Sequence, residues 1–244
     1  MFNVETTSAQ TFKIIKIHCQ LSREDTATIY KIARYEASFY NAVFDTQKND
    51  SVAINIHVFG RKADFKQTPD GENSLHFFAD GYYLERTGEI FVLKTEHVNS
   101  ALLHEISHAF LHLNLKNPPQ WFDEGLATYF GSLIVDNNQI FYTPVVGRIE
   151  RVKEMIVGKQ FIPDDFLRYN NQNWSLNHQS ITDKYTIAYS IIYFMVKTNL
   201  NLIKHMADGL KNGQTANQVF AEIFGSAQGF NNRYTNFYQQ QNLD

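Results

Sequence analysis

The residues that could do chemistry in this chain stand close together in the segment LHEISHAFLHLNLKNPPQWFDEGLATYF, which runs from residue 103 to residue 130. His104, Glu105 and His108 form the pattern HExxH, and on a helix this spacing places the two imidazoles one turn apart on the same face. Two imidazoles in that arrangement suit a single metal ion. Because a catalytic zinc ion takes three protein ligands and leaves a fourth position open for water, the pattern predicts a third ligand nearby.

Two helices must position these ligands. The first is expected to begin near Thr95, a good N-cap residue, and to end before the two prolines at 118–119, which cannot continue it. The second helix is expected to begin near Gln120. Since the chain turns back at the prolines, the second helix can bring either Asp123 or Glu124 alongside the histidines.

The second helix also carries a resemblance to a known family. Its sequence WFDEGLATYF resembles the WLNEGFAxYF segment of the zinc aminopeptidases, in which the Glu of NEG is the third zinc ligand, and HEISH fits the HExxH of the same group. The chain therefore resembles the gluzincins, and most closely their small peptidase MA-like members. The resemblance implies that one zinc ion per chain is held by His104, His108 and Glu124. One departure is the connection from His108 to Glu124, which is shorter than in the aminopeptidases.

The function that follows is a zinc-dependent metallopeptidase acting on a peptide or protein substrate. A bound zinc ion lowers the pKa of water towards about 7 and polarises the scissile carbonyl. Glu105 is rotated about 100° around the helix from His104, so it is expected to act as general base and then to protonate the leaving amine. The alternative is a metal-bearing peptide-binding or regulatory module with little or no turnover. A purely structural zinc site is disfavoured, because three ligands leave one position open.

A tyrosine is expected to complete the catalytic site. In zinc aminopeptidases a helix that opens YxKGA follows the metal motif, and its Tyr donates a hydrogen bond to the oxyanion; the comparable helix here begins YTIAYS and lacks the Lys-Gly pair. The resemblance implies this role for Tyr185, with Tyr189 as the alternative and half-buried packing as the competing explanation. Asp123 and Thr128 are candidates to hydrogen-bond the ring nitrogens that do not bind the ion.

Two other histidines are not expected to bind this ion. His112 lies eight residues after His104, so its backbone is about 12 Å away, too far to share one ion with His104. The metzincin pattern is excluded, because it needs Gly and His where the chain has Leu111 and Asn114. His57 is expected to be a solvated or hydrogen-bonded histidine of a strand.

The resemblance also implies how substrate is held. In gluzincins a sheet edge near the HExxH helix pairs with the peptide backbone, and this role falls to Glu89–Leu93, although the segment could equally be the last core strand. The GxMEN segment that anchors a free amine in aminopeptidases is absent, which weakens an exopeptidase assignment.

Composition limits the other functions. The net charge is −3 over 244 residues with no basic run, which argues against a nucleic-acid partner. Cys19 is the only cysteine, so no intrachain disulfide forms. The start of the chain is not a secretory signal and no stretch approaches the roughly 20 apolar residues of a membrane helix, so we expect a soluble, cytoplasmic protein without membrane contact, or a secreted or periplasmic one if a leader has been removed. The oligomeric state stays open.

The periodicity of the chain predicts an α+β fold, and the resemblance implies that this fold is zincin-like and forms a single catalytic domain, 1–244. Residues 1–96 form an α/β lobe and residues 97–244 a helical lobe that carries the metal site. The first lobe is expected to hold strands at 11–19, 51–59, 77–83 and 88–93 and a helix from the N-cap Ser22 to about Phe44. In the second lobe, helices are predicted at 149–157, 185–196, 199–210, 216–224 and 227–240, and a short strand or extended link at 141–146.

Overall fold

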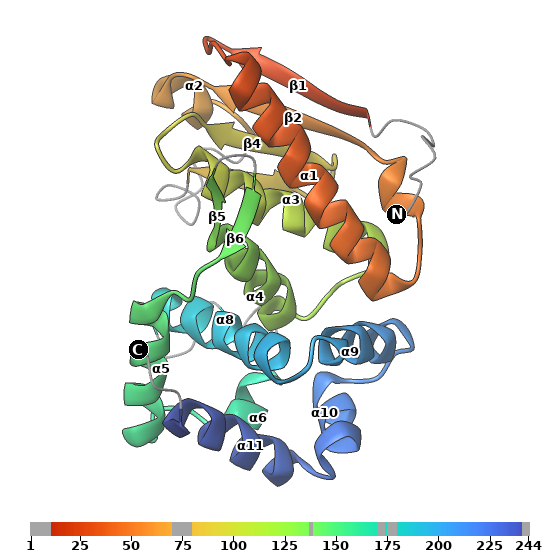
Figure 1. The fold of residues 1–244 in the computed structure, drawn as a ribbon, viewed down its shortest axis with the longest axis vertical. Coiled ribbons are helices and arrows are strands. Elements are labelled where there is room, and N and C mark those ends of the chain that lie inside the picture. The colour runs from red at the N-terminus through yellow and green to blue at the C-terminus, as the bar shows by residue number, and fades with distance from the viewer. Residues whose placement is uncertain (1–10, 70–79, 137–138, 170–173, 175–179, 241–244) are drawn as a thin grey trace. The chain divides into compact units, whose positions relative to one another are not determined.

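The computed structural model describes residues 11–69, 80–136, 139–169, 174 and 180–240, and it is an α+β protein, as predicted. A small mixed sheet comes first in the chain and helices follow (Figure 1). The residues group into two compact units, Met1–Asn114 with Leu133–Phe141, and Leu115–Ser132 with Tyr142–Asp244. Among the described helices, none is long and apolar enough to cross a membrane.

The first unit is built on a four-stranded sheet in the order β1-β2-β4-β3. Strands β1 (Thr11–Ile17), β2 (Ala53–Phe59) and β4 (Glu89–Leu93) run parallel to one another, and β3 (Gly81–Leu84) pairs antiparallel with β4. These strands lie close to the predicted ones, except that residues 77–79 of the predicted third strand are outside the described residues.

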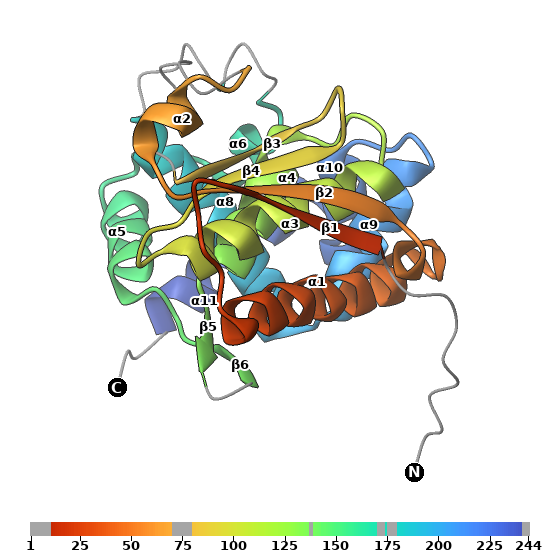
Figure 2. The ribbon, with the colours of Figure 1, turned by 90° about the horizontal axis from the view of Figure 1, so that it is seen from above.

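The two faces of the sheet are covered by different helices. Figure 2 shows α1 (Arg23–Phe44) and α2 (Lys62–Lys66) on opposite sides of the sheet. The alternation of β2 explains this division, because Ile54, Ile56 and Val58 are buried on one face while Phe59 joins an aromatic cluster with Phe65 of α2. Helix α1 begins as predicted, with Ser22 in a capping box.

Helix α3 (Val98–Asn114) packs against α1, β3 and β4, and so belongs to the first unit. The division between units therefore follows Asn114, whereas the predicted lobe boundary lies between residues 96 and 97. The reason is that α3 is apolar on most of its surface and buries Leu103, Ile106 and Phe110 completely.

The prediction that Glu89–Leu93 is the edge strand that binds the peptide is wrong. β4 has β2 on one side and β3 on the other, so both of its edges are paired and Glu89–Leu93 is an interior strand. The strand at this edge of the sheet is β3, which pairs with β4 alone among the described strands. The sequence shows β3 and β4 as neighbours, but the order of strands depends on the distant pairing of β4 with β2.

The second unit is helical and centres on α8 (Ile181–Thr198), whose residues 186–195 are all buried. Within this unit α8 packs against α4 (Gln120–Gly131), α5 (Val146–Val157), α9 (Asn201–Lys211) and α11 (Ala227–Gln240). The other described helices of this unit are α6 (Pro163–Phe166) and α10 (Ala216–Phe224). A two-stranded sheet of β5 (Leu133–Asp136) and β6 (Gln139–Tyr142) belongs, except for its last residue, to the first unit.

Candidate metal centre

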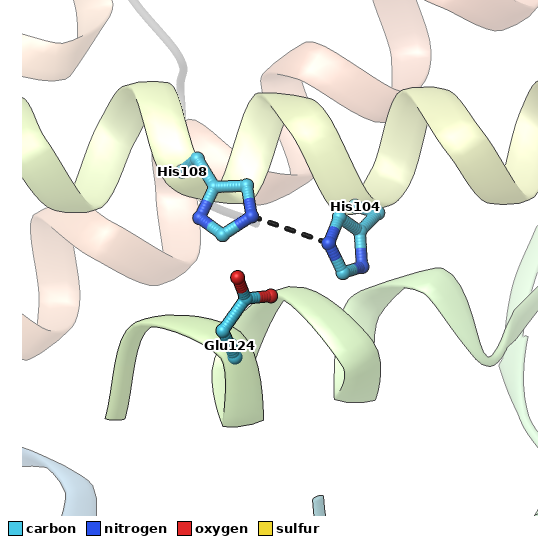
Figure 3. A group of neighbouring side chains, drawn as sticks. All are labelled: His104, His108 and Glu124. Carbon is cyan, nitrogen blue, oxygen red and sulfur yellow. Dashed lines mark hydrogen bonds between the residues drawn. The ribbon is translucent and has the colours of Figure 1, made fainter. Parts of the chain in front are cut away.

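Helix α3 carries the two histidines of the HExxH pattern one turn apart. Both side chains are half-buried, and the Nε2 atoms of His104 and His108 lie 3.2 Å from each other. The rings meet edge to face, with centroids 4.9 Å apart (Figure 3). The helix itself produces this arrangement, because residues four apart share one face.

Helix α4 carries the third predicted ligand. Glu124 is 8% exposed, and its Oε1 accepts a hydrogen bond of 3.2 Å from Nε2 of Gln120, one turn earlier on the same helix. The neighbouring Gly125 is what brings α4 close to α8: a Cβ at this position would lie 2.8 Å from the carbonyl oxygen of Ala188.

The three predicted ligands form one group. One ligand atom each from His104, His108 and Glu124 lie within 4.8 Å of one another, and the Glu124 carboxylate points toward the two imidazoles in Figure 3. Two imidazole nitrogens and a carboxylate oxygen are ligands that transition-metal ions accept. The structure therefore holds a His/Glu group that could bind a metal ion.

A second group shares one of these histidines. Ligand atoms of His108, His112 and Asp123 also lie within 4.8 Å of one another. His112 is outside the first group, as its distance along the helix predicts. Its Nδ1 lies 3.2 Å from a carboxylate oxygen of Glu85, and its ring packs against Tyr83. The sequence contained a signal for this group, since His112 follows His108 by one turn and Asp123 precedes Glu124.

Glu105, the predicted general base, is 6% exposed and lies against the edge strand. A Cβ on Gly81 of β3 would meet the Cγ of Glu105 at 3.1 Å, the Cγ1 of Val92 at 2.9 Å and the backbone oxygen of Phe91 at 3.1 Å. Position 81 therefore has no room for a side chain. The backbone of β3 passes directly beside the aliphatic part of Glu105.

The two candidate tyrosines differ in their surroundings. Tyr189 is fully buried, its hydroxyl lies 3.1 Å from that of Tyr142, and it accepts a hydrogen bond of 3.1 Å from the backbone N–H of Val145. These contacts make Tyr189 a packing residue of the second unit. Tyr185 is half-buried and lies edge to face with Trp174. Its role at the oxyanion stays a prediction.

Two residues of α1 that approach α3 were missed by the sequence analysis. The hydroxyl of Tyr40 lies 2.7 Å from Oγ of Ser107, in a buried contact next to His108. Glu36, one turn before Tyr40, is completely buried, and within the described part of the chain neither of its carboxyl oxygens has a hydrogen-bond partner. Burial raises the pKa of Glu36 well above its ordinary value, and the charge of His108 lowers that pKa in part.

The signal for Glu36 was present in the sequence. Residues 29, 32, 33, 36, 37 and 40 form the buried stripe of α1, and Glu36 is the one acidic residue within that stripe. Asp123 and Thr128 were the residues predicted to hydrogen-bond the rings of the two ligand histidines. Asp123 joins the second group, and the buried hydroxyl of Thr128 has no hydrogen-bond partner among the described residues. His57 is hydrogen-bonded as one of the predicted options, with Nε2 3.0 Å from Oε1 of Glu89.

Comparison with known proteins adds no family: no family model matches this chain, and no curated protein matches it in sequence.

Proposed function

We propose that this protein is a zinc-dependent metallopeptidase of the gluzincin type, with zinc held by His104, His108 and Glu124. The observation that carries the proposal is the grouping of two imidazoles and one carboxylate, with ligand atoms within 4.8 Å of one another, next to a buried Glu105. Three protein ligands with a carboxylate base beside them are typical of hydrolytic zinc sites.

The spacing of the histidines fits zinc. Zn–N bonds of about 2.0–2.1 Å in a tetrahedral site place neighbouring ligand atoms about 3.3 Å apart. The Nε2 atoms of His104 and His108 are 3.2 Å apart, so both can reach one ion with only small movements. The mixed nitrogen and oxygen ligands also favour zinc over calcium or magnesium, which prefer oxygen alone.

When bound, zinc supplies a Lewis acid that polarises the scissile carbonyl and lowers the pKa of water to about 7. Glu105 takes the proton from the attacking water and returns it to the nitrogen of the leaving amine. Burial suits Glu105 to this role, because proton transfer is efficient where bulk water is largely excluded. Tyr185 donates a hydrogen bond to the carbonyl oxygen as negative charge develops on it.

The substrate is a peptide held through its backbone along β3, which lies at the edge of the sheet among the described strands. Main-chain hydrogen bonds to an added strand bind an extended peptide without depending on its side chains. Because the backbone at Gly81 lies against Glu105, a peptide paired with β3 passes beside the general base. This assignment replaces the interior strand β4.

The first test is the metal content of the dialysed protein, measured by elemental analysis for the wild type and for Glu124→Ala. About one zinc per chain in the wild type and a marked loss in the variant are expected. A peptide-library cleavage assay follows, with Glu105→Gln as the matched variant that keeps all three ligands. Glu105→Gln should retain zinc and lose about 10²–10⁴-fold in rate.

Three outcomes would contradict the proposal. A wild-type chain that retains no metal when zinc is supplied would leave HEISH as a chance pattern. Equal cleavage by the wild type and Glu105→Gln would show that Glu105 is not the general base. If zinc and peptides both bind to the wild type without cleavage, the protein is a peptide-binding module instead.

A further inference from the structure

The second unit contains a cavity of about 570 Å³, and none of the described residues that line it is a predicted metal ligand. Its walls come from three places in the chain: the connection between α3 and α4, the residues directly after α6, and the connection between α9 and α10. Small-molecule sites usually have volumes of about 300–1,000 Å³. This cavity is therefore large enough to hold a ligand.

Part of the lining is apolar. Leu115, Leu167 and Ala216 are almost completely buried, and Pro119 and Leu210 are half-buried. An apolar group of a ligand leaves water when it contacts these side chains, and this transfer favours binding.

The charges of the lining have one sign. Lys116 and Arg168 are positive, and no acidic residue is among the described residues that line the cavity. Lys116 is exposed, and it makes no ion pair or hydrogen bond with the described part of the chain. A positive lining of this kind favours an anionic ligand.

The buried residue Asp164 orients two of the polar lining residues. Its Oδ2 accepts a hydrogen bond of 2.6 Å from Nη2 of Arg168, and its Oδ1 accepts one of 2.5 Å from Nδ2 of Asn217. A guanidinium has five N–H donors, so Arg168 keeps donors for a ligand. Its Nη1 also lies 3.9 Å from a carboxylate oxygen of Asp165, but both side chains are mostly exposed and the pair is weak. Because Asp164 offsets one of the two positive charges, the cavity suits the single charge of a carboxylate better than the double charge of a phosphate.

Asn217 adds a hydrogen-bond acceptor to the lining. Its Nδ2 donates to the backbone oxygen of Asp164 at 2.8 Å as well as to the carboxylate, so both amide N–H groups are used. The group that Asn217 can offer to a ligand is therefore its side-chain carbonyl oxygen. A matching ligand combines a carboxylate, an N–H donor and an apolar group. The last residue of a peptide carries all three, as its α-carboxylate, its peptide N–H and its side chain.

We propose that this cavity binds the C-terminal residue of a peptide that ends in an apolar side chain. Arg168 and Lys116 hold the terminal carboxylate, Asn217 accepts from the last peptide N–H, and the leucines contact the side chain. This site goes beyond the proposed peptidase function and does not depend on a bound metal.

The test is fluorescence anisotropy of the full chain with a fluorescein-labelled peptide, Gly-Ser-Ala-Leu, that has a free carboxyl group. The protein is used as purified and again after chelation, because a peptide could also bind or be cleaved at a metal ion. Binding of the free-acid peptide should survive chelation. The C-terminal amide of the same peptide should bind about 10–100-fold more weakly, since it lacks the charge that Arg168 and Lys116 recognise.

Two variants each remove one positive charge from the cavity, Arg168→Gln and Lys116→Gln. Both should bind the free-acid peptide about tenfold more weakly and the amide with wild-type affinity. Lys116→Gln keeps the test valid if Arg168→Gln does not fold, because Lys116 has no polar contact within the described chain. Lys211→Gln is the matched control, since Lys211 is an exposed residue of α9 that is not part of the lining. It should bind the peptide within twofold of the wild type.

Four outcomes would overturn the inference. They are equal affinity for the free acid and the amide, unchanged affinity in both charge variants, displacement of the peptide by an equal concentration of inorganic phosphate, and equal affinity for the peptide and isocaproate. Isocaproate has the carboxylate and the branched chain without the peptide N–H, so that last result would identify a free carboxylic acid as the ligand. A chain that holds no zinc and still binds the free-acid peptide would refute the proposed function and support this inference.

Discussion

Replacing Gly125 by alanine tests whether the close approach of α4 and α8 sets the position of the third ligand. The added Cβ would lie 2.8 Å from the carbonyl oxygen of Ala188 and 2.8 Å from Cγ1 of Ile192. Ordinary contact begins at 3.4 Å, so the helices must separate locally by about 0.6 Å, which is 3.4 minus 2.8. The carbonyl oxygen belongs to the backbone of a fully buried stretch of α8 and cannot rotate away.

The size of the effect follows from two opposing contributions. Overpacking a tight core costs about 1–3 kcal/mol, and the backbone contact at Gly125 places this site near the upper value. Alanine is better than glycine in a helix by about 1 kcal/mol, which leaves a net loss of about 2 kcal/mol. For a chain of this length that corresponds to a fall of about 4–8 °C in the unfolding temperature.

The assay is thermal unfolding of the metal-free protein, followed by zinc titration. Gly147→Ala is the matched control, because Gly147 lies in α5 of the same unit and a Cβ there meets nothing within 4 Å. That substitution should raise stability by about 0.5–1 kcal/mol. Gly125→Ala should also weaken zinc binding, since Glu124 moves with α4. A Gly125→Ala protein that unfolds at or above the wild-type temperature would refute this reasoning.

Three further predictions concern the site. Tyr185→Phe should lower kcat by about 10²–10³-fold with little change in stability. Tyr189→Phe should lower the unfolding temperature, because the Tyr189 hydroxyl is hydrogen-bonded in the core. A loss of kcat in Tyr189→Phe and a loss of stability in Tyr185→Phe would exchange the two roles. Gly81→Ala should reduce kcat through displacement of the Glu105 side chain, with zinc content unchanged, and an unaltered kcat would show that this contact is not critical. Chelation should lower the unfolding temperature of the wild type and leave that of Glu124→Ala unchanged, as measured by differential scanning fluorimetry.

Local features of the fold were predictable because they depend on residues near each other in the chain. The capping box at Ser22 fixed the start of α1, and the alternation of residues 53–59 gave β2. The 3.2 Å approach of the two histidine nitrogens has the same origin, since helical periodicity alone places His104 above His108.

Features that depend on distant pairing were not predictable in the same way. The edge position of β3 arises because β4 pairs with β2, more than thirty residues earlier in the register Asn55↔Glu89. The grouping of α3 with the sheet arises from its contacts with α1, β3 and β4. A sequence pattern indicates that a strand or helix forms, but it does not show with which other strand or helix that element pairs or packs.

Glu36 was missed for a different reason. The prediction of this helix gave its start at Ser22 and its extent to about Phe44, and it did not consider the acidic residue at position 36. Burial at that position is decided by the tertiary packing of α1 and not by the residue's polarity. A charged residue inside an otherwise apolar stripe is thus a useful sequence signal, because only a specific role compensates for its desolvation.

The same distinction between local and tertiary structure predicts which substitutions should weaken zinc binding and by how much. Two of the three ligands are held by the regular geometry of one helix, whereas Glu124 reaches them only through the packing that holds α4. Perturbing that packing should therefore reduce zinc affinity toward the value of Glu124→Ala and no further, because the histidine pair survives. In the double variant Gly125→Ala with Glu124→Ala, zinc affinity should equal that of Glu124→Ala alone. An additional loss in the double variant would mean that α4 also positions the histidines, and that the pair on α3 is not self-sufficient.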